Sequence, residues 1–522
     1  MFKDNSYNLY KDNLNNIESS HIKLKPTTYI KQKRKQERYN DSLAIVKKTE
    51  QDSILNKVLN DTIPLKIYSD TMNINIDKYI FDIDVEQAKL RGKLKGKDKT
   101  EKENKEKQQK QENKQFAPKP KFYFTNFYIN DMVSQIDFSF LNNSYQAFTG
   151  SGFYYNPGFN VFFKLGAMDL FEDYKITGAY RFAGNFDSNE WLVSIENLKK
   201  RVDKQLVFHR QVFDGFYGIY FTKTQSHILN YVLKYPFSQV SAVRLTLGAR
   251  TDKMVVQSSD SRSLIMDDFH KNWANIKLEY IFDNSRDIGV NLYSGNKAKV
   301  FFEAFKQIDQ AKTDLFVVGV DLRHLEKLHR SLIWATRFAA SSSFGQSKLI
   351  YYMGGVDNWM NFSSKNPTFD PSNKIDYSQN WAFQAIATNM RGFSQNVRNG
   401  SNFVVLNNEI RWPVVRYFAN RPVNSDMLNN FQIVGFFDVG SAWSGLSPYS
   451  EYNKYNIDIV PENEQGPIVL YVEKDKDPLV YGYGFGLRTR LLGYFVRADW
   501  AWGIKDQIIQ PRIFYLSLSL DF

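Results

Sequence analysis

Apolar and polar residues alternate one by one in short segments from residue 122 to residue 522. In one of these segments the apolar positions are Ile276, Leu278, Tyr280 and Phe282, and Asn275, Lys277 and Glu279 stand between them. A period of two is that of a β-strand whose two faces meet different surroundings. The pattern recurs at residues 174–183, 190–198, 204–212, 229–235, 241–250, 300–305, 315–323 and 332–338. It predicts a protein built of strands.

The length of this region sets the number of strands. At about 25 residues for a strand and its connection, residues 122–522 accommodate an even number of strands near 16, an ordinary size for a single-chain antiparallel β-barrel. Charged residues on one strand face need water, which a soluble β-sandwich also supplies. A sandwich of about sixteen strands would be large, however, and its strands rarely end so regularly in Tyr, Trp and Phe.

The composition favours a barrel in a membrane. The chain has 42 Phe, 31 Tyr and 9 Trp at a mean hydropathy of −0.47, so apolar and polar residues must be finely interleaved. Lipid-facing and lumen-facing positions alternate in a membrane barrel, and aromatic residues form its interfacial girdles. No stretch approaches the roughly 18 consecutive apolar residues of a spanning helix. We therefore expect an all-β transmembrane antiparallel barrel. The absence of cysteine suits a disulfide-free envelope protein, although many other proteins also lack it.

Residues 1–121 differ in texture and are expected to form a largely disordered or helical periplasmic linker region before the barrel of residues 122–522. In residues 93–113, lysines are mixed with acidic residues, which is typical of a solvated linker. The acidic residues argue against a nucleic-acid partner, which would require an unmixed basic surface with stacking aromatics. Residues 1–23 contain no signal peptide, so we expect the chain to be the C-terminal part of a longer precursor.

The last eleven residues form the clearest single strand pattern. Its apolar face consists of Phe514, Leu516, Leu518, Leu520 and Phe522. A terminal aromatic residue that completes such a face is what the assembly signal of a Gram-negative outer-membrane barrel looks like. Taken alone, the segment favours the closing strand of a soluble sandwich, and the rest of the chain supplies the evidence for a membrane barrel.

A cluster of motifs lies in the last third of the chain. A loop sequence, Met390-Arg391-Gly392-Phe393, follows the irregular stretch 359–389, which is expected to be an extracellular loop. Alternation in the strands that follow places Glu409, Arg411, Asp438 and Arg488 on the inner face, together with Arg497 and Asp499. Glycines at 482, 484 and 486 remove side chains from the same face and leave room for a segment folded into the barrel.

The order of these motifs resembles the bacterial surface antigen superfamily of outer-membrane barrels, the BamA-type family that also contains two-partner secretion transporters. The motifs are Arg-Gly-Phe at 391–393, Asn-Glu-x-Arg-x-Pro at 408–413, Phe-x-Asp-x-Gly at 436–440 and Gly-x-Gly-x-Gly-x-Arg at 482–488. The resemblance covers residues 351–522 and extends less clearly back to 122. Phe-Leu-Asn-Asn-Ser-Tyr-Gln at 140–146 and Met-Asp-Leu-Phe at 168–171 are similar to a branch in Bacteroidetes-like bacteria that follows a TolB-like propeller.

The resemblance implies both a site and a function. The Arg-Gly-Phe loop would fold into the lumen, where Arg391 would meet the inward Asp438 with Glu409 nearby. The family implies protein assembly into, or translocation across, the outer membrane, with outer-membrane lipid, client outer-membrane or secreted proteins and the barrel-assembly machinery as partners. The alternative is a passive anchor or scaffold for an upstream periplasmic propeller, because residues 1–120 hold no array of polypeptide-transport repeats.

Enzymatic interpretations find little support in the sequence. The histidines have no recognised metal-ligand spacing, and no nucleophile elbow is present. The glycines at 482–486 resemble a phosphate-binding loop only superficially, since that loop requires a helix after it. We expect no enzyme activity, cofactor or metal.

Overall fold

The computed structural model describes residues 125–522 apart from 143, 151, 185–187, 311–312, 362–366, 420–422, 451–452, 454–456, 461–467, 469 and 474–475, together with residues 2–3 and 6–7. The chain divides into two units, Met1–Pro120 and Lys121–Phe522. In the first unit, β1 (Phe2–Lys3) pairs with β2 (Ser6–Tyr7). The rest of the expected linker lies outside the described residues.

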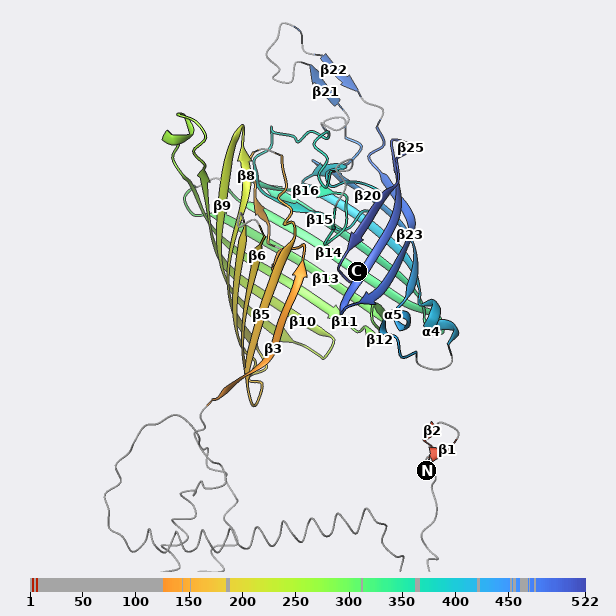
Figure 1. Ribbon diagram of the computed structural model, residues 1–522. Coiled ribbons are helices and arrows are strands. Elements are labelled where there is room, and N and C mark those ends of the chain that lie inside the picture. The colour runs from red at the N-terminus through yellow and green to blue at the C-terminus, as the bar shows by residue number, and fades with distance from the viewer. Residues whose placement is uncertain are drawn as a thin grey trace, which may run out of the picture. The chain divides into compact units, whose positions relative to one another are not determined.

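The second unit is dominated by one antiparallel sheet that curves into a barrel-shaped wall (Figure 1). Its strands are β3 (Phe127–Asp137), β5 (Asn160–Asp169), β6 (Tyr174–Ala183), β7 (Asn189–Asn197), β8 (Asp203–Tyr217), β9 (Tyr220–Pro236), β10 (Ser241–Val256), β11 (Phe269–Asp283), β12 (Arg286–Gly289), β13 (Leu292–Gln307), β14 (Leu315–His329), β15 (Leu332–Gly345), β19 (Asn402–Trp412), β20 (Gln432–Trp443), β23 (Val480–Leu491), β24 (Tyr494–Lys505), β25 (Ile508–Ile509) and β26 (Ile513–Ser517).

Of these eighteen strands, β12 and β25 are short and pair with the same neighbours as β11 and β26. The other sixteen confirm the predicted size of the barrel. Wall strands follow chain order, and wall strands that are neighbours in the sheet pair antiparallel. The end strands β3 and β26 share no backbone register within the described residues, and the sheet is therefore not closed.

Burial in the wall is the reverse of that in a soluble protein. On β7, Trp191 is 52% exposed and Ile195 is 48% exposed. Glu190, which precedes Trp191 and points to the inner face of the wall, is fully buried. On β19, Ile410 is exposed, and its neighbours Glu409 and Arg411 are buried. The period-two pattern thus places apolar residues outside and charged residues inside, as a lipid-facing wall requires.

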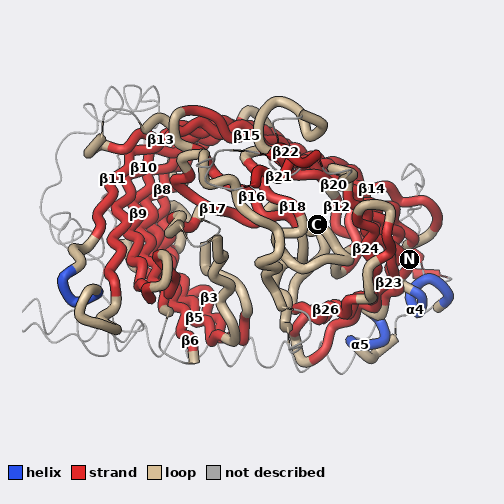
Figure 2. Tube along the Cα trace, turned by 90° about the horizontal axis from the view of Figure 1, so that it is seen from above, coloured by secondary structure: helices blue, strands red, loops and turns tan. Residues whose placement is uncertain are grey.

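A second sheet lies within the curve of the wall, as the view from above shows (Figure 2). Its strands are β18 (Arg398–Gly400), β16 (Lys348–Met353), β17 (Trp381–Ile386) and β4 (Gln146–Ala147), in that spatial order. They come from two connections of the wall, residues 138–159 after β3 and residues 346–401 after β15. We call these two segments together the plug.

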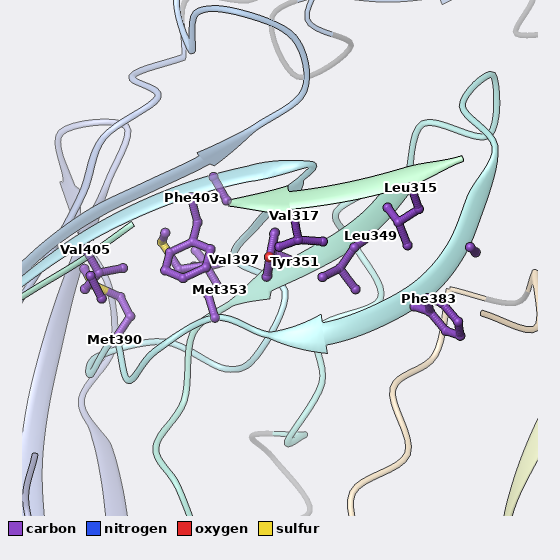
Figure 3. Packing of buried hydrophobic residues seen from close by; sticks show 14 of the residues in the cluster. Leu315, Val317, Leu349, Tyr351, Met353, Phe383, Met390, Val397, Phe403 and Val405 are labelled. Carbon is purple, nitrogen blue, oxygen red and sulfur yellow. The ribbon is translucent and has the colours of Figure 1, made fainter. Parts of the chain in front are cut away.

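The plug packs against the wall through an apolar core (Figure 3). Leu349, Tyr351 and Met353 of β16 and Phe383 of β17 belong to one buried cluster with wall residues that include Leu315, Val317, Phe403 and Val405. Burial of this set at about 25 cal/mol per Å² of apolar surface favours a plug that stays inside the wall.

The remaining elements are short. They are η3 (Ser263–Ile265), α4 (Val414–Phe418), α5 (Asp426–Asn429) and the hairpin of β21 (Ile457–Val460) and β22 (Leu470–Glu473). Among the described residues, no helix is long and apolar enough to cross a membrane.

Two expectations about this unit were wrong in detail. The stretch 359–389 is not simply an irregular outer loop, because it contains β17 and buries Trp359, Phe369 and Trp381. The final strand does not run to Phe522, since its pairing with β24 ends at Ser517. Arginine side chains on the inner wall draw the last residues inward: Asp521 is buried, and the ring of Phe522 lies 5.0 Å from the guanidinium of Arg411.

Candidate functional site: an arginine network inside the barrel

The centre of the site is Arg391, which is buried on the plug and contacts two wall strands. Its Nε and Nη2 donate to the two carboxylate oxygens of Asp438 on β20, both at 2.7 Å. Its Nη1 donates to Oε1 of Glu409 on β19 at 2.6 Å. The backbone N–H of Arg391 adds a bond to Asp438 at 3.2 Å. A planar guanidinium suits this bidentate geometry, and lysine could not reproduce it.

Neighbouring side chains complete the surroundings of Arg391. The ring of Phe436 lies 3.8 Å from the guanidinium carbon, at cation–π distance. Asn407 Nδ2 donates to Asp438 Oδ1 and to the carbonyl oxygen of Asn389, both at 2.9 Å. Burial alone would lower the pKa of Arg391, but Asp438 and Glu409 outweigh it and hold that pKa well above its usual range. The arginine is therefore a permanent cation at this position.

Glycines on the wall allow the loop backbone to come this close. A Cβ on Gly482 of β23 would overlap the carbonyl oxygen of Arg391. Gly392 has a φ of +94°, and a Cβ there would lie 2.7 Å from the backbone nitrogen of Gly503. The side chain of Phe393 in turn occupies the space beside Gly503. The Arg-Gly-Phe sequence and the wall glycines thus fit each other sterically.

The loop is also held from β26. The hydroxyl of Tyr515 accepts a hydrogen bond from the N–H of Gly392 at 3.0 Å and donates to the carbonyl oxygen of Phe393 at 2.8 Å. Tyr515 is fully buried beside Trp359 and Phe436 in a small apolar cluster. These bonds satisfy backbone groups that would otherwise be buried without partners.

The Arg391 site continues into a larger ionic network. Arg411 Nε donates to Glu409 Oε2 at 2.8 Å. Further along the wall, Arg488 contacts Asp499 at 2.7 Å and Asp521 at 2.9 Å. Arg497 also contacts Asp521, at 3.1 Å. Four arginines and four carboxylates take part in these bridges, so the network is close to neutral.

The structure brings most of the sequence-predicted residues together. Arg391, Glu409, Asp438 and Arg411 form one contact set. Arg488 contacts Asp499 and Asp521 instead, and Asn291 connects the two sets by accepting from Arg411 Nη1 and donating to Asp521. Met390 lies in the apolar core of the plug, and Gly392 and Phe393 fit against β24. Of the C-terminal set, Phe514 and Leu520 are exposed, Leu516 and Leu518 are half-buried, and Phe522 turns toward Arg411.

Three contributors were not predicted. Asp521 alternates with Leu520 and Phe522, so its inward position could have been inferred from the strand pattern. Asn291 lies between β12 and β13. Its Nδ2 donates a hydrogen bond to the carboxylate of Asp521 at 2.7 Å, and its Oδ1 accepts one from the backbone N–H of Asp521. It comes from a distant turn, and no local signal identifies it. For Tyr515, strand alternation indicates an inward aromatic residue but not its hydrogen bonds to Gly392 and Phe393.

A second buried ionic cluster lies on the opposite part of the wall. Glu190 on β7 accepts from Arg181 Nε at 2.7 Å and lies 2.8 Å from His209 Nε2. The same carboxylate accepts the backbone N–H of Leu141 on the plug at 2.9 Å. This cluster therefore anchors the first plug segment. Within the described part of the chain, no group of three or more His, Cys, Asp or Glu residues is placed to hold a metal ion.

Comparisons with known proteins find similarity only at the level of structure. No family model matches the sequence, and the search of curated proteins finds no match. BamA from Haemophilus ducreyi lacking POTRA domains 1–3 is similar with a TM-score of 0.45 and 11% identity, over 75% of this chain and 70% of that chain. CdiB from Acinetobacter baumannii has a TM-score of 0.39 and 13% identity, and the match covers 76% of this chain and 60% of that chain. CdiB from Escherichia coli has a TM-score of 0.37 and 11% identity, and the match covers 76% of this chain and 67% of that chain.

These similarities identify no family, because the identities are low and the TM-scores are below 0.5. The class of the protein is defined by the strand registers and the burial pattern described above. It is a large antiparallel barrel-shaped sheet with an apolar exterior, an ion-paired interior and a plug.

Proposed function

We propose that this protein is an outer-membrane β-barrel of the bacterial surface antigen type, acting in the assembly of proteins into the outer membrane or their translocation across it. The single observation that supports the membrane assignment is the reversed burial of the wall, with Trp191 and Ile410 outside and Glu190 and Glu409 inside. An exterior of this kind would aggregate in water, whereas lipid solvates it.

Tryptophan fluorescence in brominated lipid tests the membrane assignment. Bromine quenches a tryptophan that touches acyl chains, so the quenched fraction should fall in Trp191→Phe. Trp273 is 2% exposed and faces the plug, so Trp273→Phe is the matched control and should leave the quenched signal intact. Equal loss of quenching in the two variants, or no quenching of the parent protein, would refute a lipid-facing wall.

The proposal of assembly or translocation has two supports. One is the ordered set of motifs shared with the surface antigen superfamily. The other is the unclosed sheet, since β3 pairs with β5 alone among the described strands, and an edge strand of this kind can pair with an added strand. The partners would be outer-membrane lipid, client outer-membrane or secreted proteins, and the barrel-assembly machinery during insertion. The N-terminal unit would lie in the periplasm, and no catalytic activity is proposed.

A passive anchor for an upstream periplasmic domain is the second candidate. The plug favours it, because Phe383, Tyr351 and their neighbours occupy part of the inside of the wall with a packed core. A propeller of the TolB-like kind would then be the anchored domain.

Depletion of the protein in its own cells distinguishes the two candidates. Under the assembly proposal, folded outer-membrane proteins decrease in the membrane fraction and unfolded forms accumulate in the periplasm before growth stops. Restoring the wild-type chain should reverse both effects. If other outer-membrane proteins assemble and secreted proteins are exported normally in depleted cells, the assembly proposal fails and the anchor remains.

A further inference from the structure

The free edge of the last wall strand is not empty. The backbone N–H of Met360 on the plug donates to the carbonyl oxygen of Leu516 on β26 at 2.8 Å. Trp359 and Ser517 form an antiparallel β-bridge. Asn358 Nδ2 adds a bond to the carbonyl oxygen of Leu518 at 3.2 Å. A short piece of the plug therefore pairs with β26 as a strand would.

The pairing lies on the edge of β26 that faces away from β24. Ser517 pairs with Arg497 of β24 and also with Trp359, and a strand residue with two pairing partners has one on each edge. The second edge is the one that β3 would need in order to close the sheet. Side chains support the same arrangement, since the rings of Trp359 and Tyr515 lie 4.8 Å apart.

The plug is also tied to the β3 side of the opening. Directly after β3 the chain enters the first plug segment, whose β4 pairs with β17 through Ala147 and Phe383. The backbone N–H of Leu141 in this segment donates to Glu190 on β7, three strands from β3, at 2.9 Å. Asn156 and Gln395 exchange two amide hydrogen bonds, at 2.8 Å and 2.9 Å, and so join the two plug segments. Figure 2 shows loop segments lying between β3 and β26.

β3 itself is close to the same edge. The backbone N–H of Ile136 on β3 donates to the hydroxyl of Tyr494 at the start of β24 at 2.9 Å. One tyrosine side chain thus reaches from the β24–β26 side of the wall to the unpaired edge of β3. The plug pairs with Leu516, Ser517 and Leu518, which lie on the edge of β26 where β3 would have to pair.

We propose that the plug residues 358–360 occupy the edge of β26 in place of β3, so that the sheet closes only when the plug withdraws from this edge. Backbone pairing is exclusive, because each carbonyl and N–H on the edge serves one neighbouring strand. The plug is then an internal competitor for the seam. This inference concerns the wall alone and does not depend on the proposed cellular function.

Disulfide trapping in this chain without native cysteines tests the register. Met360 and Leu516 are opposite each other in the bridge, so Met360→Cys with Leu516→Cys should form a disulfide in high yield with copper phenanthroline as oxidant. Met360→Cys with Phe514→Cys is the matched control, because a shift of two residues separates the Cβ atoms by about 7–8 Å, beyond disulfide reach. Equal yields for the two pairs, or none for the first, would overturn the proposal.

Spin-label distances test the competition. Met132 on β3 and Phe514 on β26 are exposed on the outer face, so cysteines there can carry labels. In Met360→Pro the donor N–H is lost, and a second, shorter distance between the labels should appear. Met360→Ala keeps the N–H and should give the parent distribution. If Met360→Pro also gives the parent distribution in folded protein, the plug does not hold the seam open.

Discussion

The carbonyl oxygen of Arg391 lies in the place that a side chain on Gly482 would occupy. Gly482 on β23 pairs with Asp438 on β20. The carboxylate of Asp438 accepts two hydrogen bonds from the guanidinium of Arg391. One wall position thus gives space to the loop backbone, and the neighbouring position binds the loop side chain. Shape and charge select the same loop position.

Gly482→Ala should displace the loop from the wall. The added methyl group overlaps Arg391, and overpacking of this kind costs about 1–3 kcal/mol. Protease cleavage within residues 359–401 of the folded barrel should therefore be faster. Gly435→Ala is the control, since a Cβ on Gly435 of β20 meets nothing within 4 Å. Identical cleavage of both variants would show that the loop does not need the space above Gly482.

Asp521→Asn should destabilise the inner end of the chain. The substitution keeps the size of the side chain but removes the charge that Arg488 and Arg497 contact. A loss of about 1–3 kcal/mol in the free energy of unfolding in detergent is expected. Asp426→Asn is the control, because Asp426 is mostly exposed and contacts Arg490 at 3.6 Å; surface pairs contribute little. An unchanged unfolding curve for Asp521→Asn would remove Asp521 from the network.

The orientation in the membrane is open to cysteine labelling of intact cells. Under the proposed topology, the linker lies in the periplasm and the exposed Ser372 lies toward the outside. An impermeant thiol reagent should label a cysteine at Ser372 and not one at Lys105. The reverse pattern would invert the proposed topology.

The wall could be predicted from the sequence because strand alternation is local. Two neighbouring residues, such as the outward Phe437 and the inward Asp438, are enough to show which face of the strand is apolar and which is polar. The plug could not be predicted in the same way. β16 reads Lys-Leu-Ile-Tyr-Tyr-Met and is buried along almost its whole length, so it lacks alternation, and β4 has only two residues.

The contacts of the site were predicted unevenly for a related reason. Inward positions such as Glu409 and Asp438 follow from alternation, whereas the association of Arg391 with them rests on the resemblance of the ordered motifs. The chain end shows the limit of the pattern. Side chains still alternate at Leu520 and Asp521, although backbone pairing with β24 has ended at Ser517. Alternation indicates which face a residue takes and does not indicate its hydrogen-bonding partner.

The exchange of charges between Arg391 and Asp438 offers a further check. Arg391→Asp combined with Asp438→Arg should recover part of the loss that either single change causes, because the opposite charges are restored. Recovery should be incomplete, since the exchanged side chains differ in length and Glu409 stays in place. A double variant that is no better than the single variants would show that the attraction between these two residues does not hold the loop.

Proteolysis of the Arg391→Ala barrel tests the central claim most directly. Removing the guanidinium leaves Asp438 and Glu409 buried without their partner, which costs about 3–5 kcal/mol in a dry interior and less where water enters. Proteinase K should therefore cleave residues 359–401 at least about tenfold faster in purified, folded Arg391→Ala than in the parent protein, since 1.36 kcal/mol corresponds to a factor of ten. Arg490→Ala, which removes a half-exposed arginine, should match the parent. Equal cleavage of Arg391→Ala and the parent would contradict the claim that Arg391 holds the plug inside the barrel.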